Sequence, residues 1–450
     1  MIPRRIILPI LFFLCLPTTV FCLKKAFISI LSSDDFLTPA KVVAFRLRTI
    51  NPEIPFVILA TEDVSNDTID VLQSRDVNVL QIHKIDTPFL DTHVGAKFQY
   101  TKIRLWSLTE FDVLFHIDLD TLPISDLAPV FQCGAFCATF RHSDKFNAGI
   151  FVLKPNISVY LDLLEKVSRL DSYDGGDQGF FNAYFDELKY APMFNDKTPS
   201  DQKYTSDIMR ISAAYNYDIG MYYLNGGHTL VEPKIIHYTL GPTKPWAWWT
   251  YPVFELNQLW NTARIEMEKT YEERNYNKYL LLLGIVVAAT MFALREFTIF
   301  VSGLVIRKEK ITSIECQFLP YVLTFLSVLS AFVITPAFAH PVPSWFFFSF
   351  CTVTLSFLLS DVYKTIRLGR TTGLMQILSC MAFSLSLIGS TWILLAWVPT
   401  FGVRACMTIP LVIANFMFLS YLIRCVILSN ILMNHCSKYQ MILVTKDCVQ

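Results

Sequence analysis

Net charge and cysteine are both scarce in this sequence. Its 450 residues contain 38 lysines and arginines and 38 aspartates and glutamates, so the formal net charge is zero. A balanced chain lacks the basic excess of proteins that bind nucleic acid in bulk, and we expect no nucleic-acid partner. Residues 23–278 hold only Cys133 and Cys137, with no zinc-binding spacing. An extended segment would keep their Cα atoms too far apart for a bridge, so free thiols are favoured, with a disulfide as the alternative.

Charged residues become rare from Tyr279 onward. Only 16 of the 76 Asp, Glu, Lys and Arg residues lie there, and the hydrophobic fraction of the whole chain, 53%, exceeds that of a typical soluble domain. Apolar runs of membrane-spanning length predict an all-α bundle of about five spans. The predicted spans are Tyr279–Ile306, Phe318–Phe338, a short third span Trp345–Ser360, Leu374–Val398 and Met407–Leu428.

The arrangement of charge predicts how the chain crosses the membrane. Residues 1–22 carry two arginines followed by an apolar run, the pattern of a signal peptide; an uncleaved signal anchor is the alternative. Residues 23–252 would then form a lumenal domain, 253–278 a linker helix, 279–430 the spans, and 431–450 a cytosolic tail. Basic residues in the loops after the first and third spans satisfy the positive-inside bias. The intramembrane pair Arg295–Glu296 either marks a pathway or caps a short span.

The lumenal part alternates strand and helix patterns. Candidate strands at Lys25–Leu31, Pro52–Ala60 and Val77–Ile82 are separated by helical patterns at Thr38–Ile50 and Val64–Arg75. This order predicts a Rossmann-like α/β fold with a mostly parallel sheet. Ligands of such sheets bind beyond the carboxyl ends of the strands.

One such strand runs into a pair of carboxylates. The stretch FHIDLDTL places Asp118 and Asp120 after the buried strand Val113–Ile117, on the same side of the chain. Two such carboxylates supply half of a site for a hard divalent cation, although alone they could be a solvated pair in a turn. His237 lies at the end of a further candidate strand, Ile235–Tyr238, and is either an imidazole metal ligand or a structural histidine.

Five motifs then occur in a recognisable order. They are TKIRLWSL, HIDLDTL, FNAGIFVLKPN, DGGDQGFFNAYF and HYTLGPTKPW, spread over Lys24–Tyr251. In this order they resemble the glycogenin-like glycosyltransferases, retaining enzymes of the GT-A fold. The last motif, followed by more tryptophans and a membrane bundle, looks most like the plant inositol phosphorylceramide glucuronosyltransferase branch of that family.

The resemblance implies a role for each site residue. Asp118, Asp120 and His237 would hold Mn²⁺, with Mg²⁺ as the alternative. The nucleotide-sugar donor would be bound by Ile30, Ser32, Ser33, Phe36, Lys102, Asn147, Gly241 and Lys244. Asp177, Gln178 and Lys102 would lie at the reacting carbon. Phe36 stands where glycogenin has a tyrosine, and HYTLG is one residue longer than in glycogenin, so the placement of Gly241 is open.

The expected function is glycosyl transfer in a secretory-pathway membrane, namely the Golgi. A UDP-sugar, plausibly UDP-glucuronate, would be the donor and a lipid such as inositol phosphorylceramide the acceptor. The alternatives are a polysaccharide or protein acceptor, and a membrane sensor or transporter that only binds nucleotide sugar. A cluster of aromatic residues next to the first span is either a membrane-interface belt, which favours a lipid acceptor, or a core cluster. The cluster comprises Trp246, Trp248, Trp249, Tyr251 and Trp260.

Overall fold

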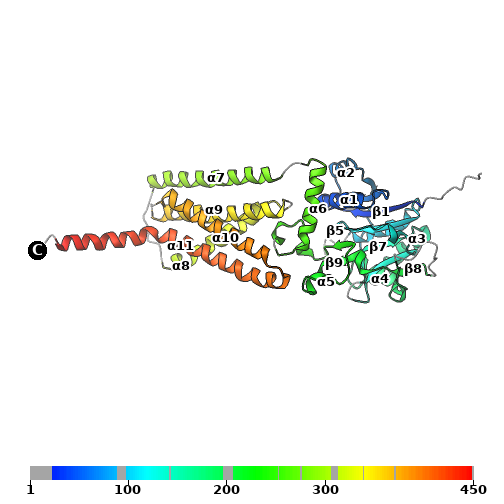
Figure 1. Ribbon diagram of the computed structural model, residues 1–450. Coiled ribbons are helices and arrows are strands. Elements are labelled where there is room, and N and C mark those ends of the chain that lie inside the picture. Colours follow the sequence, from blue (N-terminus) through cyan, green and yellow to red (C-terminus); the bar gives the residue numbers. More distant parts are fainter. Residues whose placement is uncertain are drawn as a thin grey trace, which may run out of the picture.

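The computed structural model consists of an α/β domain and a bundle of long helices (Figure 1). It describes residues 23–88, 98–140, 143–195, 206–251, 253–273, 276–305, 313–337, 339–368 and 371–447. The predicted signal peptide, the basic residues predicted in the loop after the first span (Arg307, Lys308 and Lys310) and Arg370 lie outside these ranges. Lys364 and Arg367, predicted in the loop after the third span, are helical instead.

A seven-stranded sheet forms the centre of the α/β domain. Its order is β3-β2-β1-β4-β7-β6-β8. The first four strands in this order are mutually parallel, β7 runs antiparallel to both β4 and β6, and β8 pairs in parallel with β6. The strands are β1 (Lys25–Leu31), β2 (Phe56–Thr61), β3 (Asn78–Ile82), β4 (Val113–Ile117), β6 (Phe136–Phe140), β7 (Phe146–Leu153) and β8 (Ile208–Arg210). The predicted α/β fold with a mostly parallel sheet is confirmed.

Helices cover both faces of this sheet because alternate strand residues point to opposite faces. On one face, α1 (Leu37–Ile50) and α2 (Asn66–Gln73) pack against Phe27 and its neighbours. On the other face lie α3 (Ile157–Lys166), α4 (Asp177–Tyr184) and η3 (Gln99–Ser107). The last of these is a 3₁₀ helix, and three of its buried residues, Tyr100, Ile103 and Trp106, recur every three positions, the period of a 3₁₀ helix.

A small second sheet closes the edge where β4 ends. It has the order β5-β10-β9, formed by β5 (Thr121–Pro123), β10 (Ile235–His237) and β9 (Tyr217–Asp218). In the antiparallel pairing of β10 with β5, His237 lies opposite Thr121. This register brings His237 beside Asp120, more than a hundred residues away in the sequence.

Cys133 and Cys137 form a disulfide, so the favoured expectation of free thiols is wrong. Cys133 directly follows the 3₁₀ helix η4 (Ala128–Gln132), and β6 begins only at Phe136. The chain bends at Cys133 and at Ala135, and the two Cα atoms lie 6.5 Å apart, within reach of a bridge.

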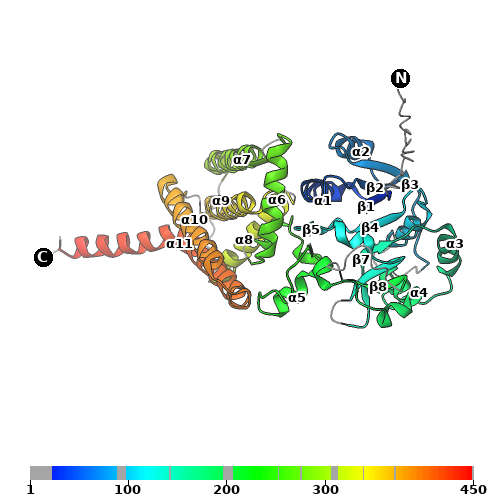
Figure 2. The ribbon, with the colours of Figure 1, turned by 45° about the vertical axis from the view of Figure 1, so that its right-hand side comes forward.

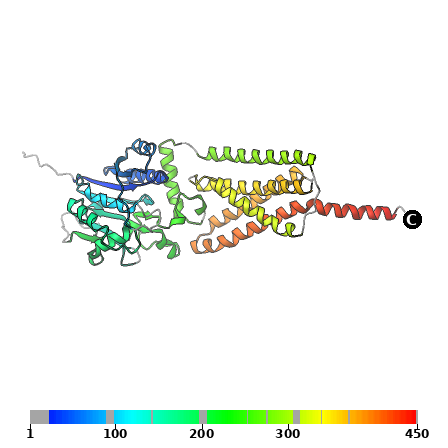
Figure 3. The same ribbon diagram turned by 180° about the vertical axis from the view of Figure 1, so that it is seen from behind.

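Five helices in the described part of the chain are long and apolar enough to cross a membrane, which confirms the predicted number. They are α7 (Tyr276–Val305), α8 (Ser313–Ile334), α9 (Pro341–Leu368), α10 (Leu374–Trp397) and α11 (Phe401–Asp447). The helix α11 extends beyond the others at the end farthest from the domain (Figure 3). The prediction of a short third span is wrong, because α9 continues through Asp361. The buried Asp361 carboxylate lies 2.8 Å from the guanidinium of Arg295 in α7. Arg295 is thus paired inside the bundle and does not cap a short span.

The helix α6 (Leu256–Thr270) joins the two parts and lies between them (Figures 1 and 2). Side-chain contacts connect this region to the bundle: Glu268 lies 2.7 Å from His340, and Glu255 forms an ion pair with Arg404 at 3.2 Å. The tryptophan cluster divides between the two parts. Trp246 packs on Trp260 of α6, whereas the buried Trp248 packs on Phe332 of α8 and on two aromatic side chains of α9, Trp345 and Phe348.

Candidate active site

The three predicted metal ligands come together at the end of β4. Asp118 follows the strand directly and donates its backbone N–H to the Gly149 carbonyl of β7 at 2.8 Å. The Asp120 carbonyl accepts from the backbone N–H of Tyr238 at 2.9 Å, which fixes it beside the end of β10. One ligand atom each from Asp118, Asp120 and His237 lies within 4.8 Å of the other two.

The chemistry of this set fits a divalent cation. His237 Nδ1 lies 2.8 Å from Asn216 Oδ1, an acceptor, so Nδ1 carries a proton and Nε2 is the ring nitrogen that could bind a cation. Nε2 lies 3.2 Å from Asp120 Oδ1, close enough for both atoms to bind one cation. A Cβ on Gly149 would lie 2.4 Å from His237 Cε1 and 2.8 Å from Asp118 Oδ2. Glycine therefore leaves this space free of side-chain atoms.

Asp120 is also bound to a lysine. Lys244 Nζ donates to Asp120 Oδ2 at 2.6 Å and to the Tyr238 carbonyl at 2.5 Å. Burial alone would raise the pKa of Asp120, but the nearby His237 and Lys244 outweigh it and hold this pKa well below its ordinary value. Asp120 is therefore a carboxylate at neutral pH, as a metal ligand must be.

Lys102 joins the metal site to the predicted reaction site. Its ammonium lies 3.1 Å from Asp118 and 2.9 Å from Asp177, and it donates to the Ala148 carbonyl at 2.9 Å. Burial would lower the pKa of Lys102, but these carboxylates outweigh it and raise this pKa above its ordinary value. Burial raises the pKa of Asp177. Lys102 thus donates to Asp118 and to the Ala148 carbonyl and forms an ion pair with Asp177, so a donor phosphate would have to compete with these groups for the ammonium.

A chain of side-chain amides connects His237 to the predicted sugar site. Asn216 donates to Asn147 Oδ1 at 2.9 Å, Asn147 donates to Gln178 Oε1 at 2.8 Å, and Gln178 donates to the Tyr173 hydroxyl at 2.6 Å. Each amide therefore has a defined orientation. The structure brings Asn147, Asp177 and Gln178 together, as expected, with Asn147 and Gln178 in direct contact.

A cavity of about 610 Å³ opens beside the carboxylates. It is lined by the predicted uridine-binding residues Ile30, Ser32, Ser33 and Phe36 together with Lys102, Asp118 and Asp120. Lys244 borders the same site through Asp120. Gly241 begins the short helix η7 (Gly241–Thr243), where it is exposed and an added Cβ would meet no atom within 4 Å. The roles of these residues in binding remain predictions.

Sequence reasoning missed two residues of the site. His116 is fully buried, and its Nε2 lies 3.0 Å from Asp118 Oδ1. Its position two residues before Asp118, on the same side of the strand, was an available signal. Asn216 orients His237 from a segment that carries no metal-site pattern in the sequence.

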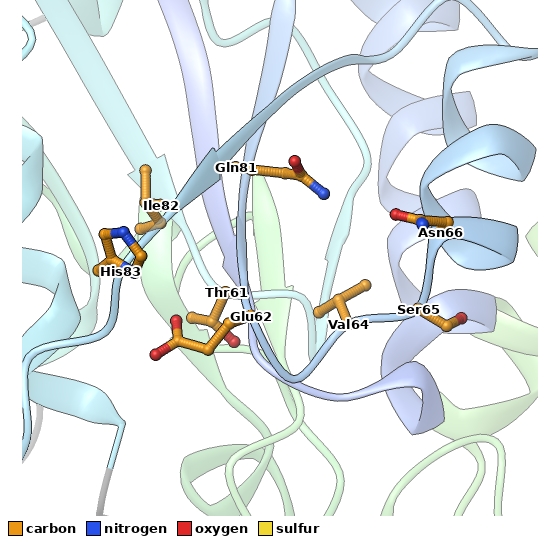
Figure 4. A pocket seen from close by; sticks show the side chains of 8 residues that line it. All are labelled: Thr61, Glu62, Val64, Ser65, Asn66, Gln81, Ile82 and His83. Atoms are coloured by element: carbon orange, nitrogen blue, oxygen red, sulfur yellow. The ribbon is translucent and has the colours of Figure 1, made fainter.

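A second cavity of about 550 Å³ lies at the ends of β2 and β3. Figure 4 shows Glu62 and His83 at one side of it and Asn66 at the other. Among the described residues, only Asp118, Asp120 and His237 form a group of three possible metal ligands. The cavity beside these three is therefore the candidate active site.

Comparison with known proteins identifies a family that the chain resembles. Residues 138–250 match the model of glycosyl transferase family 8. The chain is 31% identical over 252 residues to inositol phosphorylceramide glucuronosyltransferase 1 of Arabidopsis thaliana, covering 55% of this chain and 47% of that protein. It is 28% identical over 229 residues to glycogenin-1 of Mus musculus, covering 49% of this chain and 65% of that protein. The chain thus spans about half to two thirds of the length of these relatives.

Among solved structures, the crystal structure of the galactosyltransferase LgtC in complex with donor and acceptor sugar analogs is similar at 14% identity and a TM-score of 0.40. The similarity covers 54% of this chain and 95% of that chain. The family match and the relatives confirm the predicted resemblance: residues 138–250 match the glycosyl transferase family 8 model and lie within the α/β domain. In this chain the domain is followed by five helices that could span a membrane.

Proposed function

We propose that this protein is a membrane-embedded, metal-dependent, retaining glycosyltransferase that moves a sugar, plausibly glucuronate, from a UDP-sugar to the headgroup of a lipid. Inositol phosphorylceramide is the candidate acceptor, and the Golgi membrane is the candidate location, with the catalytic domain in the lumen and the C-terminus in the cytosol. The relative named for this acceptor supports the choice.

One observation supports a lipid acceptor above the others. Lys244 bonds the metal-ligand carboxylate of Asp120, and four residues later Trp248 packs on the helices of the bundle. Four residues span at most about 15 Å between Cα atoms. The candidate active site therefore lies near the end of the bundle that meets the domain. If that end lies at the membrane surface, a lipid headgroup can reach the site.

The charges at the site suit a diphosphate leaving group. Asp118, Asp120 and His237 would hold the divalent cation, which would neutralise charge on the diphosphate when bound. Lys244, at 2.6 Å from Asp120, is placed to donate to a phosphate oxygen on the same side. Asn147 and Gln178 present amides at the predicted sugar site, and Lys102 keeps Asp177 in place beside it. Asp177 would stabilise positive charge developing on the reacting sugar carbon.

The experiment incubates microsomes containing the full-length protein with a panel of labelled UDP-sugars and separates lipid from polymer and protein products. We expect label in a lipid fraction, from one UDP-sugar above the others and only with a divalent cation present. Label in polysaccharide or protein would support the alternative acceptors. Binding of a UDP-sugar without any transfer would support the sensor or transporter alternative.

A further inference from the structure

A tripeptide on the surface of the α/β domain has the pattern that N-linked glycosylation modifies. Asn156, Ile157 and Ser158 form an Asn-X-Ser sequence in which X is not proline. Asn156 directly precedes α3, and all three residues are exposed. The lumenal location proposed above would place this tripeptide in the secretory pathway, where such sequences are modified.

The hydrogen bonds of Asn156 leave its amide nitrogen available. Its Oδ1 accepts from the backbone N–H groups of Ser158 at 2.9 Å and Val159 at 3.4 Å, so this oxygen caps α3. Its backbone N–H donates to the Trp106 carbonyl at 2.9 Å, which ties the cap to η3. Among the described residues, Nδ2 of Asn156 has no hydrogen-bond partner. Glycosylation uses Nδ2 and keeps Oδ1, so a glycan and the helix cap are compatible.

A glycan at this position would cover apolar side chains that the fold leaves in water. Ile157 and Leu161 of α3 are 51% and 59% exposed, and they lie four residues apart on one face of the helix. Because Ile157 adjoins Asn156 in the chain, the first sugars would lie beside this apolar pair. Covering apolar surface removes it from water, which is favourable, and glycans are bulky and increase solubility.

Asn156 lies at the edge of the sheet opposite to the candidate active site. The strand β7 starts beside that site, where Asn147 and Gly149 lie, and it ends at Leu153. From Gly149 to Leu153 the strand runs about 13 Å at 3.3 Å per residue, and Asn156 follows beyond its end. Figure 2 shows α3 on the side of the domain away from the bundle. A glycan on Asn156 would therefore lie away from both the donor cavity and the bundle.

The tripeptide at residues 66–68 also fits the pattern but lies at the same sheet edge as the candidate active site. Asn66 begins α2, which follows the end of β2. The preceding residue, Ser65, donates its backbone N–H to Asp34 at 3.0 Å, and the residues on either side of Asp34 line the candidate active-site cavity. The contrast favours Asn156 as the position where a glycan leaves the catalytic site undisturbed.

We propose that Asn156 carries an N-linked glycan that covers the Ile157 and Leu161 side chains, an inference that rests on the proposed lumenal location of the domain and not on its substrates. In the transfer step, Asn156 Nδ2 forms a bond to C1 of the first sugar of an oligosaccharide carried on a polyprenyl diphosphate. The bond between C1 and the diphosphate oxygen breaks, the polyprenyl diphosphate leaves, and one amide proton passes to a base of the oligosaccharide-transferring enzyme. The cap through Oδ1 persists in the product.

The test measures occupancy of Asn156 in the full-length protein isolated from eukaryotic microsomes. Peptide N-glycosidase F releases the glycan and converts the modified asparagine to aspartate, so peptide mass spectrometry reads the occupancy directly. We expect a glycan in wild type and in the matched control Asn66→Gln. We expect none in Ser158→Ala, which removes the hydroxyl of the pattern but keeps the backbone N–H that the cap uses. An unmodified Asn156 in wild type would overturn the proposal.

The covering role has its own readout. Purified Ser158→Ala should aggregate more than wild type, and adding Leu161→Gln should reverse this, because it removes exposed apolar surface. Equal aggregation of wild type and Ser158→Ala would overturn the covering role. If Ser158→Ala does not fold, Asn156→Asp also abolishes glycosylation and keeps a capping oxygen.

Failure of this proposal can be told apart from failure of the proposed function. Protease digestion of a C-terminal tag in the same microsomes reports on the topology, and transfer assays report on catalysis. Ser158→Ala should transfer sugar at the wild-type rate, since α3 lies away from the donor cavity. An unmodified Asn156 with a digested tag and normal transfer would overturn the glycan alone.

Discussion

A methyl group added at Gly149 should disrupt the metal site without removing any ligand. In the Gly149→Ala variant, the new Cβ would lie 2.4 Å from His237 Cε1 and 2.8 Å from Asp118 Oδ2. Carbon atoms pack at about 3.5–4.0 Å, so the imidazole or the strand must move by about 1 Å. The imidazole has little freedom to do so, because Asn216 holds its Nδ1 at 2.8 Å.

The size of the effect follows from that displacement. A misplacement of about 1 Å costs roughly 10²-fold in rate, or about 2.7 kcal/mol of transition-state stabilisation. We therefore expect kcat for sugar transfer to fall by about two orders of magnitude and the affinity for Mn²⁺, measured by calorimetry, to fall as well. Overpacking should also destabilise the domain, by about 1–3 kcal/mol.

The matched control is Val152→Leu, which overpacks the same strand at a residue buried in the core away from the site. It should lower the unfolding temperature while leaving kcat and Mn²⁺ affinity of the folded protein unchanged. If Gly149→Ala keeps kcat within about threefold of wild type, the argument that this glycine leaves room for the cation is refuted.

Four further predictions concern the site, the docking of the domain and the topology. Asp120→Asn removes a charged ligand, worth several kcal/mol, so transfer should fall at least a hundredfold in a protein that still melts cooperatively; retention of a tenth of wild-type kcat would contradict this. Asn216→Ala frees the His237 ring and should weaken Mn²⁺ binding about 10–100-fold, as read by calorimetry; an unchanged dissociation constant would argue against the assigned tautomer. Burial would raise the pKa of Glu268, but bonds from His340 and from a neighbouring arginine outweigh it and hold the pKa below its ordinary value. The pair's stabilisation is thus present above about pH 4.5 and lost as the pH falls through the folded-state pKa, so wild type should lose more thermal stability on acidification than Glu268→Gln. A tag at the C-terminus should be digested by protease added to sealed microsomes, and its protection would contradict the proposed cytosolic position.

The sheet and the proposed metal ligands Asp118 and Asp120 could be predicted from the sequence because the patterns that indicate them are local. The strands read as short apolar runs, and strand alternation puts Asp118 and Asp120 on one side. His237 could be assigned only through the family resemblance, since its position depends on the pairing of β10 with β5. The alternation of apolar and polar residues along a strand does not indicate which other strand it pairs with. The same holds for Asn216, which reaches His237 from a 3₁₀ helix preceding β9.

Charged residues in the bundle show a different limit of sequence reasoning. The predicted third span ends at Ser360, just before Asp361, and an isolated carboxylate is costly inside a membrane. In the structure Asp361 accepts from Arg295 of α7 and from the backbone N–H of Thr372, so the helix continues with its charge compensated. Compensation of this kind depends on which helices are neighbours, and hydropathy along a single segment carries no such information.

The segment that follows Lys244 explains why the domain and the bundle should act as one unit. Asn261 and Asn257 of α6 donate to the carbonyls of Pro245 and Thr243, on either side of Lys244. The position of α6 therefore sets the position of the Lys244 backbone, and through the 2.6 Å bond that of the Asp120 carboxylate. Since α6 is itself held against the bundle through the bond of Glu268 to His340, displacing α6 would disturb the metal site without touching a ligand. A soluble fragment that ends before the bundle should consequently bind Mn²⁺ more weakly than the full-length protein, even where its sheet is intact.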